Sequence, residues 1–138
     1  MIQRKQTLWL IICTIAALLS FTFPFVTGKI LVKGIPADMA FKAGDDFLIL
    51  ILTGSSLILS AITIFLYKDR KMQIKLCLVG LLISVVIIIP YISHMNKLSK
   101  STASLTCILP FLMAVGYFLA FRDIRKDEKL VKSLDKLR

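Results

Sequence analysis

The sequence predicts an all-α membrane protein, an antiparallel bundle of four transmembrane helices followed by a C-terminal cytoplasmic amphipathic helix. Four long segments contain no Asp, Glu, Lys, Arg or His, and 57% of all residues are hydrophobic. Because a bilayer core of about 30 Å is crossed by roughly 20 helical residues, each segment is long enough to span it. We expect one domain, residues 1–138, with spans at residues 7–26, 47–67, 74–92 and 101–121.

The first segment could instead be a secretory signal peptide, because Arg4 and Lys5 precede its apolar run. A signal peptidase needs small side chains after such a run, whereas this chain continues with Phe21, Phe23 and Phe25. We therefore expect the first segment to remain in the protein as a span.

The basic residues predict the orientation of the spans. Thirteen Lys and Arg residues precede the first span, join the second to the third, or follow the fourth, whereas only five lie in the other two connections. Because short cytoplasmic loops carry an excess of cations, both termini should be cytoplasmic. The net charge of +10 is thus explained by topology, and we expect no nucleic-acid partner.

The connections between spans differ on the two sides of the membrane. Residues 67–72 form a short basic turn, which predicts a helical hairpin between the second and third spans. Residues 27–46 contain too many Gly and Pro residues for a long helix, so we expect a loop over the outer face. At its end, Asp45 and Asp46 should cap the second span; two adjacent carboxylates without further ligands make a poor metal site.

Small and hydroxylic residues within the spans predict where the helices pack. Lipid offers no hydrophobic drive for helix association, so close contact between small residues and hydrogen bonds must hold the bundle together. Alternatively, the hydroxyl groups of these residues could line a path for a neutral solute. The expected packing residues are Gly54, Ser56, Ser60, Thr63, Gly80, Ser84, Gly116 and Ala120.

Aromatic residues and one proline complete the expected spans. Trp9 and Tyr67 near the inner boundary and Tyr91 near the outer boundary should be interfacial anchors. Pro110 falls well inside the predicted fourth span and should kink it.

The sequence offers little chemistry for an enzyme. The three cysteines lie in three different spans without a Cys-x-x-Cys pair, and the chain has one histidine. The predicted spans hold no carboxylate of the kind that couples transport to protons. We therefore expect no catalytic residues, no bound metal and no cofactor.

The C-terminal residues 122–138 predict an amphipathic helix that continues the fourth span. Asp123 and Asp127 lie on its apolar side, where a helix that lies in an anionic membrane surface would not place them. We expect these acids to pair with the basic turn after the second span, and the tail to dock a partner. The expected docking residues are Asp123, Asp127, Leu130, Val131, Leu134, Leu137, Lys68, Arg70 and Lys71.

Both ends of the chain resemble a known family. Met1-Ile-Gln-Arg-Lys-Gln-Thr7 and the string from Arg122 to Arg138 are similar to the small four-span membrane proteins of Bacteroidetes grouped as domain of unknown function 4293. The resemblance implies a bacterial inner-membrane location and a four-helix plan, and it carries no activity.

Two functions are expected on these grounds. The first is a non-catalytic accessory or scaffolding subunit of a membrane assembly, with the lipid bilayer and a protein or a second copy of the chain as partners. The alternative is a small oligomeric transporter or channel for a neutral or anionic solute. A water-filled cavity lined by Ser56, Ser60 and Thr63 would favour the alternative.

Overall fold

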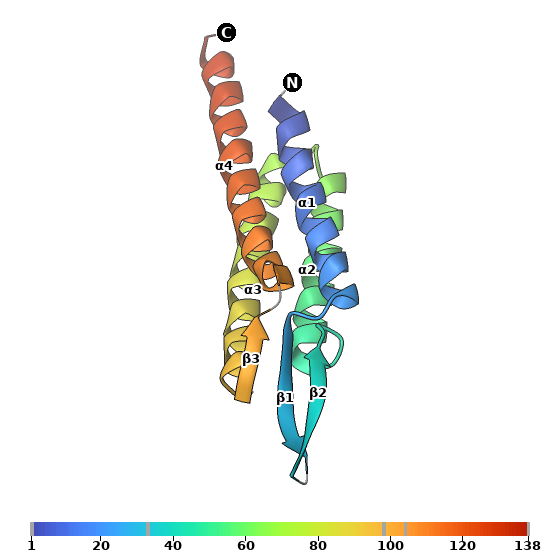
Figure 1. Ribbon diagram of the computed structural model, residues 1–138. Helices are drawn as coiled ribbons and strands as arrows, with labels where there is room; N and C mark the ends of the chain where they lie inside the picture. The colour runs from blue at the N-terminus through green and yellow to red at the C-terminus, as the bar shows by residue number, and fades with distance from the viewer. Residues whose placement is uncertain (1, 33, 98, 104, 138) are drawn as a thin grey trace.

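The structure is a computed structural model that describes residues 2–32, 34–97, 99–103 and 105–137. Four of its helices are long and apolar enough to cross a membrane, which confirms the predicted four-span plan. They are α1 (Ile2–Thr22), α2 (Phe47–Phe65), α3 (Arg70–Lys97) and α4 (Ile108–Lys136). In Figure 1 the first turn of α1 and the last turns of α4 lie at the same end of the bundle.

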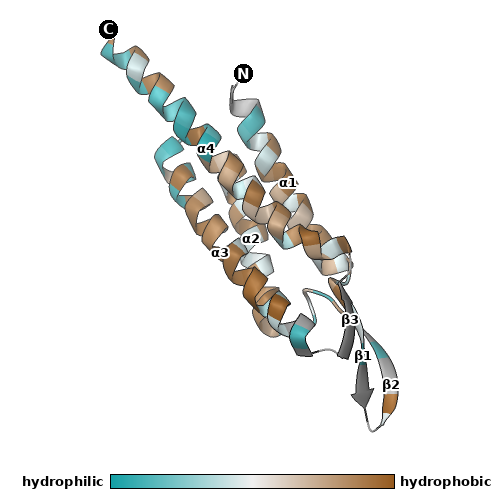
Figure 2. Ribbon diagram, turned by 60° about the vertical axis from the view of Figure 1, so that its left-hand side comes forward, coloured by the Kyte–Doolittle hydropathy of each residue, from teal (hydrophilic) through white to brown (hydrophobic). Residues whose placement is uncertain are grey.

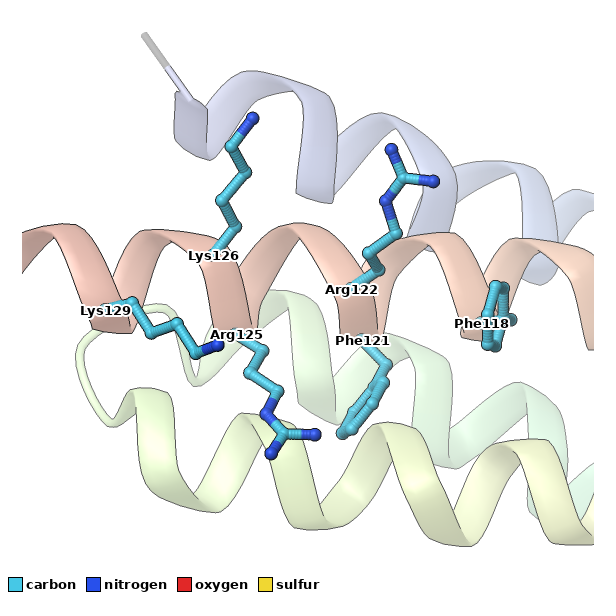
Figure 3. Close-up of a pocket in the computed structure, with 6 residues that line it drawn as sticks. All are labelled: Phe118, Phe121, Arg122, Arg125, Lys126 and Lys129. Atoms are coloured by element: carbon cyan, nitrogen blue, oxygen red, sulfur yellow. The ribbon is translucent and has the colours of Figure 1, made fainter.

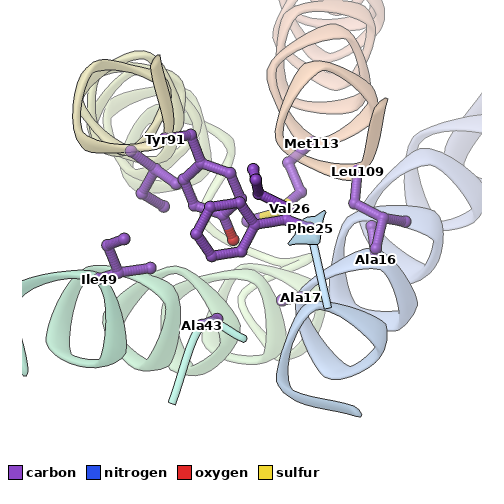
Figure 4. Close-up of a cluster of buried hydrophobic side chains, with 10 residues drawn as sticks. Ala16, Ala17, Phe25, Val26, Ala43, Ile49, Tyr91, Leu109 and Met113 are labelled. Carbon is purple, nitrogen blue, oxygen red and sulfur yellow. The ribbon is translucent and has the colours of Figure 1, made fainter. Parts of the chain in front are cut away.

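Each helix packs on the next one along the chain, and α4 closes the bundle against α1. Two buried clusters fill the interior. The first lies toward the end of the bundle opposite the termini and includes Phe25, Tyr91 and Met113, whose side chains meet in Figure 4. The second lies nearer the termini and consists of Leu10, Cys13, Cys77, Tyr117, Ala120 and Ile124.

A three-stranded antiparallel sheet lies at the end of the bundle opposite the termini (Figure 1). Strands β1 (Val26–Val32) and β2 (Ile35–Phe41) form a hairpin, and β3 (Ser99–Ala103) pairs with the other edge of β1. Gly34 has a φ of 82°, a left-handed conformation that glycine adopts without strain in a hairpin turn. The connection over residues 27–46 is therefore not a long helix, as expected, but most of it forms strands that were not predicted.

The sheet shortens two of the predicted spans. Helix α1 ends at Thr22 rather than at residue 26, because Val26 already belongs to β1. Helix α4 begins only at Ile108, after β3 and a 3₁₀ turn, η1 (Leu105–Cys107). Pro110 therefore lies in the first turn of α4, where its missing N–H removes no helical hydrogen bond, and the predicted kink was wrong.

Two further expectations also change at this end. Tyr91 is not an interfacial anchor, because it is buried and its ring centroid lies 3.9 Å from that of Phe25. Asp46 occupies the N-cap position of α2, but its side chain makes no capping hydrogen bond. The Oδ2 of Asp45 instead accepts a hydrogen bond of 2.7 Å from the backbone N–H of Lys42.

Candidate functional site at the charged end of the bundle

The hydroxyl face of α2 points into the bundle. Ser56, Ser60 and Thr63 are all buried. The Ser60 hydroxyl lies 2.9 Å from that of Thr14 on α1, and the carbonyl of Thr63 accepts a hydrogen bond of 3.2 Å from the Gln73 side chain on α3. The helix contacts expected from this face are therefore made partly through hydrogen bonds between different spans.

Tyr117 is the interior residue that the sequence reasoning missed. It is fully buried, and its phenol donates a hydrogen bond of 2.8 Å to the carbonyl oxygen of Ser56, whose own hydroxyl lies 3.3 Å away. This contact joins α4 to α2 across the bundle. A tyrosine in the middle of a span is a usable signal, because its hydroxyl must find a partner where water is absent.

The small residues divide into two groups. A Cβ atom built on Gly80 would lie 2.5 Å from Cε1 of Tyr117, and one built on Gly116 would overlap the Sγ of Cys13. Ser84 and Ala120, their partners at four-residue spacing, are fully buried. Gly54 is different, since a Cβ there would meet no atom within 4 Å. Its expected packing role was wrong.

Tyr117→Phe is expected to destabilise the bundle, because it removes the hydrogen bond to Ser56 and leaves a buried carbonyl without that donor. Interhelical hydrogen bonds in membranes average about 0.6 kcal/mol and reach about 1.7 kcal/mol. The free energy of unfolding in detergent should fall by about 1 kcal/mol. The matched control is Tyr67→Phe at an exposed position, and equal losses in the two variants would contradict the assignment.

At the end nearer the termini, α4 continues without interruption into the charged tail (Figure 2). The tail is thus helical as far as Lys136, and Arg138 lies outside the described residues. The Nη2 of Arg70, in the first turn of α3, lies 3.4 Å from the Oδ2 of Asp127. The side chains of both residues are mostly buried, at 29% and 13% exposure. The first turns of the tail thus lie against the turn between α2 and α3.

One turn of α4 carries a second ion pair. The Nζ of Lys132 lies 2.8 Å from the Oε1 of Glu128, four residues earlier. The hydrogen bond from Lys132 lowers the pKa of Glu128, so any stability that this pair contributes is present at neutral pH and is lost as acid protonates the carboxylate. A groove of about 400 Å³ separates this part of the tail from the turn, and its lining includes Lys68, Lys71 and Val131.

Exposure increases along the tail from its first turn to its end. Asp123 is half-buried and forms no ion pair within the described part of the chain, in contrast to its expected pairing. Ile124 is fully buried in the second cluster, but the later apolar residues are increasingly exposed. Leu130 is 43% exposed, Leu134 64% and Leu137 84%.

The interior holds thiols but no arrangement typical of a metal centre. Cys13 and Cys77 are buried in the second cluster, and Cys107 is half-buried in η1. Among the described residues, no three His, Cys, Asp or Glu side chains form a group that could hold a metal ion. What the charged end offers is ion pairing and exposed apolar surface.

Asp127→Lys is expected to release the tail, because a second cation would then face Arg70. A partly exposed ion pair contributes at most about 1 kcal/mol, so protease cleavage within the tail should become about 5-fold faster. Adding Arg70→Glu should restore protection. Asp135→Lys is the matched control, since it makes the same charge change in an exposed part of the tail. Equal cleavage of the original and Asp127→Lys proteins would contradict the contact.

The comparison with known protein families gives a match over nearly the whole chain. A family model described as Domain of unknown function (DUF4293) matches residues 2–137. No curated protein and no solved structure matches the chain. Because the match covers nearly the whole sequence, the chain belongs to the family described as Domain of unknown function (DUF4293).

Proposed function

We propose that this protein is a non-catalytic accessory or scaffolding subunit of an assembly in a bacterial inner membrane, which docks a protein partner through its tail. The observation that carries the proposal is the end of α4, which extends past the turn between α2 and α3 with Leu130 and Leu134 exposed (Figure 1). Apolar surface on a charged segment outside the bilayer is unfavourable in water unless another surface covers it.

The contact between Arg70 and Asp127 supports a docking role for the tail. It fixes the first turns of the tail against the bundle, so the exposed residues beyond it leave the membrane in a defined direction. A preoriented helix loses less conformational freedom on binding than a free segment does. The partner that fits this segment has an apolar strip bordered by acidic groups, because basic residues flank the exposed leucines.

The alternative transporter or channel is less well supported. A path for a solute would need free polar groups along its wall, whereas the hydroxyls of Ser56 and Ser60 and the carbonyl of Thr63 are engaged in hydrogen bonds inside the bundle. Among the described residues, two buried polar atoms, Nε2 of Gln6 and Oγ1 of Thr53, have no hydrogen-bond partner. Gln6 lies in the second turn of α1 and Thr53 in the second turn of α2, toward opposite ends of the bundle (Figure 1), so the two atoms do not line one continuous path.

The proposal is tested by purification of the full chain from its native membranes in mild detergent, with identification of what accompanies it. We expect one protein at a constant ratio, and its loss from the Leu134→Lys variant. Ser133→Lys is the matched control, because it adds the same charge to the neighbouring position on the basic side of the tail. A chain that purifies alone, or a partner retained by Leu134→Lys, would contradict the docking role.

Orientation gives a separate prediction. With thirteen cations on the side of the termini and five on the other, both termini should be cytoplasmic. A reporter enzyme that is active only outside the cytoplasm should work when inserted after Gly34, in the turn of the hairpin, and fail when fused after the last residue. Activity of the C-terminal fusion would overturn this orientation.

A further inference from the structure

A second groove lies on the side of α4 that faces away from the bundle, where the helix passes from apolar to charged residues. Its volume is about 490 Å³. Figure 3 shows Arg122 and Lys126 projecting to one side of the helix, Arg125 and Lys129 to the other, and the rings of Phe118 and Phe121 nearer the apolar end. The groove therefore has two aromatic rings toward its apolar end and four cations toward its charged end.

The residues that precede the groove on the same face of α4 indicate its depth in the membrane. Phe111, Val115 and Phe118 follow one another at helical spacing and are 53%, 52% and 53% exposed, as expected for side chains that contact lipid tails. Arg122 is the next residue on the same face. The groove thus begins where the lipid-facing surface ends, at the depth of the headgroups.

The groove cations are not paired with carboxylates in the part of the chain that the structure describes. Three carboxylates lie along this part of the helix: Asp123 forms no ion pair among the described residues, Asp127 pairs with Arg70, and Glu128 pairs with Lys132. Within the described residues, none of the four groove cations lies at ion-pair distance from a carboxylate. Arg125 lies 5.8 Å from the centroid of the Phe121 ring, which leaves its N–H groups free to face an anion.

We infer that this groove binds the phosphodiester headgroup of an anionic phospholipid, with an acyl chain along Phe118. Arginine pairs well with phosphate oxygens through parallel hydrogen bonds. Cationic clusters beside a span are attracted to anionic lipid by about 1 kcal/mol for each Lys or Arg. A zwitterionic headgroup carries its own cation beside the phosphate and gains less. This site does not depend on the proposed protein partner, because it lies on the outer surface of α4 at headgroup depth.

The test uses the full chain in non-ionic detergent, with native mass spectrometry to count bound lipids. Phosphatidylglycerol should bind at least 10-fold more tightly than phosphatidylcholine with the same acyl chains. Changing both Arg122 and Arg125 to Gln should weaken phosphatidylglycerol binding about 30-fold, since each lost cation accounts for about 5-fold. The matched control changes Lys68 and Lys71 to Gln, which removes the same charge outside this groove. It should weaken binding less than 3-fold.

Three results would overturn the inference. Equal binding of the two lipids excludes a headgroup site, and this measurement needs no variant. Equal losses in the groove and control variants would indicate attraction to the general positive charge rather than a site. In the third result, millimolar inorganic phosphate displaces bound phosphatidylglycerol as effectively as added phosphatidylglycerol does. That result would show that the groove binds a free anion and that the acyl chain contributes nothing.

Discussion

Gly80→Ala is expected to lower the free energy of unfolding of the bundle by about 1–3 kcal/mol, the range for inserting a methyl group into a packed interior. The new Cβ would lie 2.5 Å from Cε1 and 2.7 Å from Cζ of Tyr117. The ring has little freedom to retreat, because it is fully buried and its phenol is bonded to Ser56. Helices α3 and α4 must therefore move apart, which also loosens the bond to α2.

Gly54→Ala is the matched control for this effect. It makes the same substitution inside a neighbouring span, but the added methyl group meets no atom within 4 Å. Alanine is the better helix former, so this variant should be as stable as the original protein or slightly more stable. Reversible unfolding of both variants in the same detergent gives the comparison. Similar changes in the two variants would contradict the close contact between Gly80 and Tyr117.

Gly116→Ala is expected to have an effect of similar size, and its cause can be isolated by a second substitution. The added Cβ would overlap the Sγ of Cys13, whereas the nearest backbone atom, the carbonyl oxygen of Trp9, lies 3.4 Å away at an ordinary contact distance. Removing the sulfur with Cys13→Ala should therefore make room for the methyl group.

A double-mutant cycle measures this relief. Gly116→Ala should cause a smaller loss of unfolding free energy in the Cys13→Ala background than in the original protein. The two losses should differ by at least about 1 kcal/mol, within the range of coupling energies between residues in contact. Cys77→Ala is the control, because it removes a buried thiol of the same cluster from a different helix. Equal relief by both cysteine substitutions would place the clash elsewhere.

Much of the fold was predictable because it depends on local composition. Four apolar segments must be helical in a bilayer, whatever they pack against, since each backbone group has to be bonded within its own segment. The burial of Ser56, Ser60 and Thr63 followed from their helical spacing on one face of α2. The same reasoning placed Asp127 beside the basic turn, although it did not select Arg70 from the available cations.

The sheet was not predictable in this way. Strand β3 contains Ser99, Lys100, Ser101 and Thr102 and shows no apolar alternation, so no local pattern distinguishes it from a loop. It is a strand because it lies beside β1, which comes more than sixty residues earlier. That pairing also moved the start of α4 to Ile108 and placed Pro110 in its first turn.

The sequence by itself determined the number of spans, their alternating direction and the continuation of α4 into a charged tail, because each follows from how a short segment interacts with lipid or water. The tertiary structure alone decided which small residues lie at close contacts. Gly54 and Gly80 both occur within apolar helices, yet only Gly80 faces an aromatic ring. The difference arises because close packing depends on which side chain a neighbouring helix brings to that position, and this is set by the arrangement of all four helices together.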